Sequence, residues 1–178
     1  MKGHSDSVRC LGTFSDYLFS GSNDSTVRMW HRESGTLLRT FEFKSRVMCL
    51  QAVDHFLYTG MADKTVMRSA IEERPGVTDS RPPLYQGARN SVTALSVHDD
   101  RVLVGSADNR VHIFDLKTFK HLNSIEGHTD WIRGLVFSPP FLYTCSEDGT
   151  VRRCFYSADD CEFSPCFLPA FLFSLLSP

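Results

Sequence analysis

The stretch Gly21-Ser22-Asn23-Asp24-Ser25-Thr26-Val27-Arg28-Met29-Trp30 is a tight polar turn between two apolar runs, and it decides the fold. Imperfect copies recur three more times, at residues 60–66 (GMADKTV), 105–111 (GSADNRV) and 145–151 (CSEDGTV). The aspartates of the four turns, at positions 24, 63, 108 and 148, are separated by 39, 45 and 40 residues. A repeat with a period near 40 residues indicates one supersecondary unit that is stacked four times.

Each copy of the turn is surrounded by the same order of short apolar runs. In the first unit, Val8 and Leu11 mark one strand, and further strands are predicted at Tyr17–Ser20, Val27–Trp30 and Leu37–Phe43. Short strands rich in Val, Leu, Phe and Tyr predict an antiparallel meander. Their apolarity is continuous rather than alternating, so both faces of each sheet should be covered. Helical periodicity is absent, and we expect an all-β chain.

The repeats divide the chain into a repeat region and a tail. The repeat region spans residues 1–156, with units at about 3–43, 44–86, 87–126 and 127–156. Within the second unit, residues 72–83 hold three prolines and several charges, which predicts a long loop. The tail, residues 157–178, abandons the repeat, and two expectations stay open for it: disorder, or an origin in splicing or truncation.

Composition limits the classes of function. The chain has 178 residues, 42% apolar content and a net charge of −2, so it can fill a core but lacks the basicity typical of proteins that bind nucleic acids or anionic membranes. The first residues contain no apolar signal segment, and the most apolar stretch, residues 167–176, is about half of what spans a bilayer. We expect a cytoplasmic or nuclear protein, or one present in both compartments, with no membrane contact.

The cysteines predict neither a disulfide framework nor a metal site. Cys10 and Cys49 each precede a turn aspartate by 14 residues, where the other units have Ala94 and Gly134. This is a small-residue core position, and a free cysteine behaves there as a small hydrophobe. Three other cysteines fall together without a second CxxC pair, which is weak metal spacing; they are Cys154, Cys161 and Cys166. We expect reduced thiols and no cofactor.

A Gly-His pair followed after about 20 residues by Gly-Ser-x-Asp-x-Thr-Val-x-x-Trp resembles the WD40 repeat family, and the resemblance covers about residues 3–156. It implies four four-stranded antiparallel blades of a β-propeller. Because rings of this family usually have seven or eight blades, we expect an incomplete or open ring. A four-bladed ring, and two chains joined as an eight-bladed ring, stay open as alternatives.

The resemblance also implies a buried hydrogen-bond chain in the first unit, from the Trp30 indole through Ser20 and His4 to Asp24. Buried polar groups need such partners. The fourth unit keeps the equivalents of three of these residues, and Cys154 replaces the tryptophan; the three are His128, Thr144 and Asp148. The second unit keeps Thr59 and Asp63 without a histidine. The third has Ala88, Val104 and Phe114 instead, which leaves Asp108 alone and predicts a blade held by apolar packing.

Ser20, His4 and Asp24 are also the residue types of a nucleophilic triad. The set recurs once per repeat, however, and no Gly-x-Ser-x-Gly elbow surrounds Ser20. We therefore interpret it as structural and expect no enzymatic activity and no catalytic residues.

The expected function is that of a non-enzymatic scaffold or adaptor, whose partners are peptides, other proteins, further copies of itself or further blades. In the resembled family, positions beside the first strand and before the turn aspartate line one face. The predicted partner-binding residues on that face are Arg9, Arg46, Met48, Trp131, Arg133 and Glu147. Such a basic and aromatic surface suits an acidic or phosphorylated peptide. Two alternatives stay open: Trp131 packs between blades, or the face binds RNA or a phosphate-bearing ligand, although the near-neutral charge disfavours nucleic acid.

Overall fold

The computed structural model of the chain describes residues 2–72, 85–86, 90–157 and 162–163. This part of the chain consists of β-strands joined by turns, and it contains no helix that is long and apolar enough to cross a membrane. The all-β prediction is confirmed. The strands form four antiparallel sheets, here called blades 1 to 4, in which strands adjacent in sequence are adjacent in the sheet.

The blades follow the four sequence repeats. Blade 1 consists of β1 (Val8–Phe14), β2 (Tyr17–Ser22), β3 (Thr26–His31) and β4 (Leu37–Glu42). Blade 2 consists of β5 (Val47–Val53), β6 (Phe56–Met61), β7 (Thr65–Ala70) and β8 (Tyr85–Gln86). Blade 3 consists of β9 (Val92–His98), β10 (Arg101–Ser106), β11 (Val111–Asp115) and β12 (His121–Ile125). Blade 4 consists of β13 (Ile132–Ser138), β14 (Phe141–Ser146), β15 (Val151–Ser157) and β16 (Glu162–Phe163).

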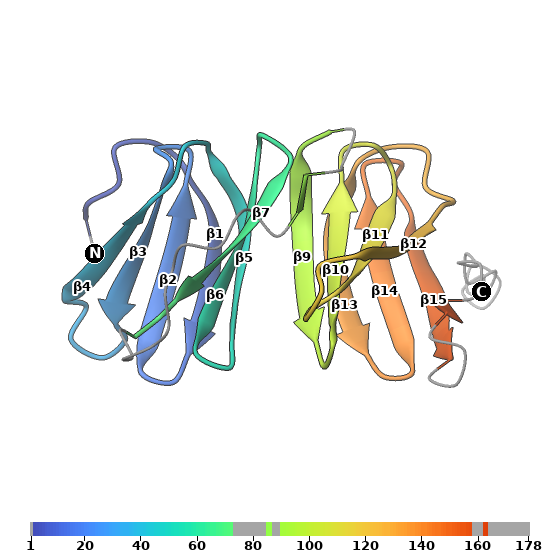
Figure 1. Cartoon of the computed structure of the whole chain (residues 1–178). Coiled ribbons are helices and arrows are strands. Elements are labelled where there is room, and N and C mark those ends of the chain that lie inside the picture. Colours follow the sequence, from blue (N-terminus) through green and yellow to red (C-terminus); the bar gives the residue numbers. More distant parts are fainter. Residues whose placement is uncertain (1, 73–84, 87–89, 158–161, 164–178) are drawn as a thin grey trace, which may run out of the picture.

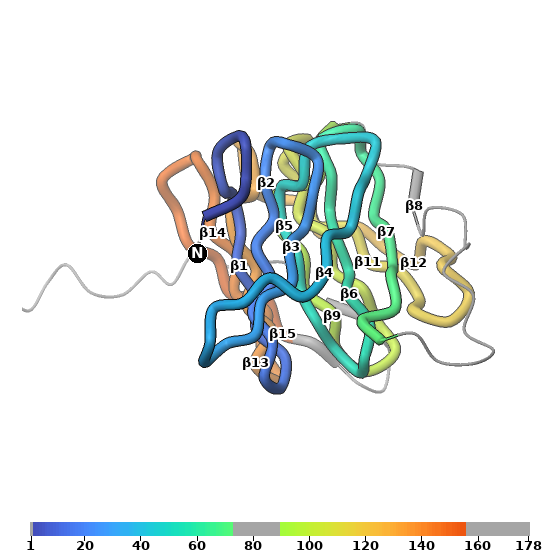
Figure 2. The backbone as a smooth tube through the Cα atoms, turned by 90° about the vertical axis from the view of Figure 1, so that its left-hand side faces the viewer, coloured from blue at the N-terminus to red at the C-terminus, as the bar shows by residue number. Residues whose placement is uncertain are grey.

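The four blades stand side by side in an open row. The first strands of successive blades contact one another, β1 with β5, β5 with β9 and β9 with β13. Blades 1 and 4 lie at opposite ends of the row (Figure 1), and a view from the N-terminal end shows β1–β4 in front of the other blades (Figure 2). The described residues therefore form an arc of a propeller and not a closed four-bladed ring.

The apolar core lies between the blades. One cluster joins Phe19 and Val27 of blade 1 to Val47, Leu50 and Leu57 of blade 2. Corresponding clusters fill the junctions between blades 2 and 3 and between blades 3 and 4. Blades 2 and 3 are thus covered on both faces, as the continuous apolarity of their strands predicts. For blades 1 and 4 the prediction is wrong within the described residues, because each packs against one neighbouring blade and has exposed apolar side chains such as Leu11 and Val151.

Two stretches differ from the sequence expectations or fall outside the described residues. The predicted loop at residues 72–83 lies almost wholly outside them, and of the fourth strand of blade 2 the structure describes Tyr85 and Gln86. In blade 4, β15 extends to Ser157 and pairs with β16, so the sheet continues past the expected end of the repeat at residue 156. The remainder of the tail lies outside the described residues.

The cysteines are in two chemical states. Cys10, Cys49 and Cys145 are free thiols, and burial raises the pKa of Cys10 to about 12. Cys154 is buried and disulfide-bonded. The expectation of reduced thiols is therefore wrong for Cys154. Within the described ranges, no group of three or more His, Cys, Asp or Glu side chains is arranged to hold a metal ion.

Candidate functional site

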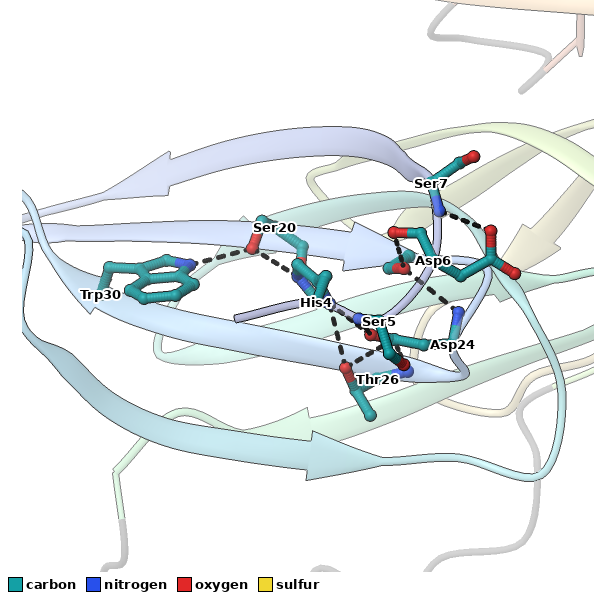
Figure 3. Close-up of polar contacts among 9 residues, drawn as sticks. His4, Ser5, Asp6, Ser7, Ser20, Asp24, Thr26 and Trp30 are labelled. Carbon is teal, nitrogen blue, oxygen red and sulfur yellow. Dashed lines mark hydrogen bonds and ion pairs between the residues drawn. The ribbon is translucent and has the colours of Figure 1, made fainter. Parts of the chain in front are cut away.

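In blade 1, four side chains from four segments form one hydrogen-bonded chain (Figure 3). His4 Nδ1 lies 2.8 Å from Asp24 Oδ2, and because an ionised carboxylate can only accept, the ring donates to it. His4 Nε2 lies 2.8 Å from Ser20 Oγ, and the Trp30 indole N–H donates to the same oxygen at 2.9 Å. Ser20 is buried, and its hydroxyl is used by these two contacts. The chain connects the segment before β1 with β2, the turn and β3.

Asp24 is the anchor of this chain. Besides His4, its carboxylate accepts the backbone N–H of Ser5 at 3.0 Å and the Thr26 hydroxyl at 2.7 Å. Burial raises the pKa of Asp24, but the hydrogen bonds from Thr26, His4 and Ser5 outweigh burial and hold the pKa well below its ordinary value. The carboxylate is therefore charged and saturated with donors, which suits a structural role better than general-base chemistry.

Blade 4 contains the same arrangement without the tryptophan. His128 Nδ1 lies 2.7 Å from Asp148 Oδ2, and His128 Nε2 lies 2.8 Å from the Thr144 hydroxyl. The pKa of Asp148 is lowered for the same reasons as that of Asp24. Cys154 occupies the place of the indole and is fully buried.

In blade 3, the expectation that Asp108 has no histidine partner is wrong. His112, on β11, points its Nε2 at Asp108 Oδ2 at 3.0 Å, and its Nδ1 lies 2.9 Å from Ser124 Oγ on β12. Both side chains of the pair are about nine-tenths buried. Blade 3 therefore has a polar anchor, supplied from inside the sheet instead of from the segment before its first strand.

Blade 2 has the least complete network. Asp63 binds the backbone N–H of Thr65 at 3.2 Å and the Thr65 hydroxyl at 2.5 Å, with no histidine beside it. Thr59, in the place of Ser20, is fully buried, and its hydroxyl has no hydrogen-bond partner in the structure. An unpaired buried hydroxyl destabilises the fold by about 1–3 kcal/mol.

We therefore expect Thr59→Val to stabilise the protein by about 1 kcal/mol, because valine has the same shape and removes the unpaired group. The matched control is Thr144→Val in blade 4, which deletes the partner of His128 Nε2 and should lower the free energy of unfolding. Chemical denaturation of both variants measures the two changes. If both substitutions change the free energy of unfolding in the same direction, the hydroxyl groups of Thr59 and Thr144 do not differ in hydrogen bonding as proposed.

The predicted partner-binding face draws on two positions in each blade, one beside the first strand and one before the turn aspartate. In every blade a backbone hydrogen bond joins these two regions. The N–H of the residue before the turn aspartate donates to the carbonyl of a residue just before the first strand, at 3.0 Å each time. The four pairs are Asn23 with Ser7, Ala62 with Arg46, Ala107 with Ser91, and Glu147 with Trp131. The two sets of positions therefore adjoin at the same end of each blade.

In blade 4 this end carries a cluster of three side chains, Trp131, Arg133 and Glu147. Trp131 is 41% exposed and so is not packed between blades. The Arg133 guanidinium lies over its ring, with Cζ 5.2 Å from the centroid. Arg133 Nε donates to Glu147 Oε1 at 2.9 Å, and a second nitrogen of the guanidinium reaches the same oxygen.

The other predicted face residues do not join this cluster. Arg9 donates to the Asn23 side chain at 3.0 Å on blade 1, and exposed Arg46 and half-buried Met48 lie on blade 2. Arg9 belongs to blade 1 and Trp131 directly precedes β13 of blade 4, and these two blades lie at opposite ends of the open row (Figure 1). The expected single basic patch is therefore not formed within one chain, and the charge of Arg133 is already paired with that of Glu147.

Comparison with known proteins gives the family. The family described as "WD domain, G-beta repeat" matches residues 1–31, 82–115 and 119–152. The "CCR4-associated factor 4 homolog" of Candida glabrata is 30% identical over 135 residues, which are 76% of this chain and 19% of that protein. "Mitochondrial division protein 1" of Saccharomyces cerevisiae is 30% identical over 131 residues, which are 74% of this chain and 16% of that protein. The chain thus spans less than a fifth of the length of either relative.

Two solved structures show the same fold. The computationally designed Ika8 protein has a TM-score of 0.71 and 26% identity, over 87% of this chain and 48% of that protein. The WD40 β-propeller domain of Doa1 has a TM-score of 0.77 and 24% identity, over 95% of this chain and 56% of that chain. With the family match covering more than half of its residues and four blades in repeat register, the chain belongs to the WD40 repeat family and forms an open part of a β-propeller.

Proposed function

We propose that this chain is a non-catalytic protein-interaction module that binds a peptide or a loop of a partner protein at the Trp131 cluster of blade 4. The observation that carries the proposal is the exposed indole with a guanidinium over it. Tryptophan and arginine are enriched among the few interface residues that supply most of the binding free energy. The ion pair with Glu147 fixes the position of the guanidinium before binding, which lowers the entropy lost on association.

The charges of the cluster define the partner. Because Glu147 neutralises Arg133, the surface does not select for a purely acidic or phosphorylated ligand. A free edge of the indole favours an apolar or aromatic side chain, and the exposed oxygen and nitrogen atoms of the ion pair favour neighbouring polar groups. A segment with one large apolar side chain between polar residues therefore fits better than RNA. The name of the Candida glabrata relative describes a protein associated with another protein, which supports an assembly role for such repeats.

The test combines affinity capture with titration. Proteins retained by the wild-type chain are identified by mass spectrometry, and a segment from a retained partner is then titrated against the purified chain. Trp131→Ala should weaken that binding by about 2 kcal/mol, roughly 30-fold in Kd. The control is Leu38→Ala, which removes a side chain of similar exposure on the outer strand of blade 1.

Equal binding by wild type and Trp131→Ala would move the site away from blade 4. Binding that falls steeply with salt, with a partner pool dominated by RNA, would favour the electrostatic alternative.

A further inference from the structure

Two histidines of blade 3 point at the same hydroxyl group. His112 on β11 places its Nδ1 2.9 Å from Ser124 Oγ, and His121 on β12 places its Nε2 2.9 Å from the same oxygen. The centroids of the two rings are 5.8 Å apart. The strand β12 is the outermost strand of this sheet, so two ring nitrogens from neighbouring strands converge on one point at the outer edge of the blade.

The position of the hydrogen on the His112 ring follows from its other contact. The Asp108 carboxylate lies 3.0 Å from His112 Nε2, and because an ionised carboxylate can only accept, this nitrogen carries a hydrogen. A neutral histidine has one ring nitrogen with a hydrogen and one with a lone pair. In neutral His112 the lone pair is therefore on Nδ1, the nitrogen that faces Ser124.

The pair of Asp108 and His112 also has the arrangement that supports metal binding. Both side chains are about nine-tenths buried, so the ring is held in one orientation. Histidines that bind a metal ion usually donate their second ring N–H to a carboxylate or a carbonyl, which fixes the tautomer and raises the basicity of the ligating nitrogen. His112 already has this partner on the side of the ring that faces away from Ser124.

His121 supplies a second lone pair and an open approach. Burial, and after it the nearby His112, lower the pKa of His121 below its ordinary value, so its ring is neutral at pH 7.5. The edge of its ring packs against the Phe114 ring, with the centroids 5.1 Å apart. His121 is exposed and Ser124 is half-buried, so a small ion can reach the point between the two histidines from solvent.

The distances suit an ion that is bound by imidazole nitrogens. Zinc lies about 2.0–2.1 Å from a histidine nitrogen, so one ion bound to both rings needs the two nitrogens no more than about 4.2 Å apart. Each nitrogen already lies 2.9 Å from the common oxygen, and rotation of the exposed His121 ring can bring the nitrogens to that separation. Imidazole is a good ligand for Zn²⁺, whereas Mg²⁺ and Ca²⁺ prefer oxygen ligands.

We propose that Zn²⁺ binds between His112 Nδ1 and His121 Nε2, where it takes the place of the Ser124 hydroxyl as their common partner. Among the described residues, no group of three His, Cys, Asp or Glu side chains surrounds a single point, so water completes the coordination of the ion. Structural zinc sites have four protein ligands and catalytic sites three, so the ion at this site exchanges with solvent and the fold does not require it.

A bound ion joins the edge strand β12 to β11 more firmly than the serine does, because each nitrogen then binds directly to the metal. This inference goes beyond the proposed function and does not depend on it, since the two histidines lie on the outer strands of blade 3 and the Trp131 cluster lies on blade 4.

The test is a titration of the wild-type chain with ZnCl₂ at pH 7.5, after treatment with a chelator and its removal. Calorimetry measures the affinity, and ¹H–¹⁵N spectra of the imidazole rings identify the ligands. The signals of His112 Nδ1 and His121 Nε2 should shift, whereas His112 Nε2 should keep its hydrogen. Lowering the pH to 5.5 should weaken the binding, because protons compete with the ion for both nitrogens.

His121→Leu removes one of the two ligands at an exposed position and should leave the circular dichroism spectrum unchanged. It should weaken Zn²⁺ binding by at least about 100-fold, because loss of even a group behind a ligand weakens metal binding by about 10–100-fold. The matched control is His31→Leu in blade 1. His31 Nδ1 also lies near a serine hydroxyl, 3.0 Å from Ser34 Oγ, but no second histidine contacts that oxygen among the described residues, so Zn²⁺ binding should not change.

Ser124→Ala separates the role of the serine from that of the histidines. The substitution removes the hydroxyl that competes for both nitrogens, so Zn²⁺ should bind to this variant at least as tightly as to the wild type.

Three results would overturn the proposal. Absence of Zn²⁺ binding by the wild-type chain shows that the two nitrogens do not form a site. Equal affinities of the wild type and His121→Leu place the ion elsewhere in the chain. Loss of binding in Ser124→Ala shows that the hydroxyl, and not the pair of histidines, holds the ion.

Discussion

Asp24→Ala is expected to give the largest loss of stability of any single substitution considered for the polar network. The change leaves His4 Nδ1, the Ser5 N–H and both donors of Thr26 without their acceptor. Each buried group left unpaired destabilises the protein by about 1–3 kcal/mol, and partial hydration of the exposed donors reduces the total to about 3 kcal/mol. For a chain of this size, the melting temperature should fall by about 6–12 °C.

The matched control is Asp63→Ala in blade 2. Asp63 is exposed, and among the described residues only Thr65 donates hydrogen bonds to its side chain, so its removal should lower stability by about 1 kcal/mol. Thermal melts monitored by circular dichroism compare the two variants. If Asp24→Ala lowers the melting temperature no more than Asp63→Ala does, Asp24 is not the anchor of blade 1.

His112→Leu is expected to give the second largest loss of stability among the substitutions in the polar network. Leucine preserves most of the apolar volume on β11 but removes the contacts of the ring with Asp108 and Ser124, which lie at 3.0 and 2.9 Å. Hydrogen bonds to a charged group contribute about 1.5–3 kcal/mol, so we expect a loss of about 2 kcal/mol, measured by urea unfolding.

The neighbouring His121 provides the control for His112. It also binds Ser124, at 2.9 Å, but it is exposed and has no contact with Asp108 among its hydrogen bonds. His121→Leu should change stability by less than about 0.5 kcal/mol. Equal losses in the two variants would mean that Ser124, and not Asp108, is the partner that matters in blade 3.

The repeat register was sufficient to predict the architecture. Four copies of one turn at a spacing near 40 residues indicated four sheets. The structure has four sheets, and in each of them one copy of the turn joins the second strand to the third. The register was not sufficient to predict the role of His112, because the repeat pattern places its histidine before the first strand, at the position of His4, and His112 lies on the third strand. In blade 3, His112 on the third strand pairs with Val104, just as Arg28 pairs with Ser20 in blade 1. From this position the His112 side chain reaches the carboxylate of Asp108 in the turn. The spacing of four residues between Asp108 and His112 across the turn was the available signal.

The predicted partner-binding face, which includes Trp131 and Arg133, was predicted less completely than the architecture, for two physical reasons. The first reason is that the ion pair between Arg133 and Glu147 depends on three-dimensional geometry. From the sequence, the two residues were predicted as separate members of the partner-binding face, without a contact between them. The separation of 14 residues that joins Arg9 to Asn23 also joins Arg133 to Glu147, so the spacing could have indicated both contacts. The exposure of Trp131 could not be predicted, because aromatic residues at strand ends are found both between blades and in solvent.

The placement of the core between blades has a consequence for how the protein unfolds. Each apolar cluster joins only two neighbouring blades, so the molecule behaves as a linear array in which stability is transmitted from one unit to the next. Among the described residues, blades 2 and 3 each pack against two neighbouring blades, whereas blades 1 and 4 each pack against one, so we expect unfolding of this array to begin at blades 1 and 4. Blade 2, which has the weakest polar network, is protected by its central position.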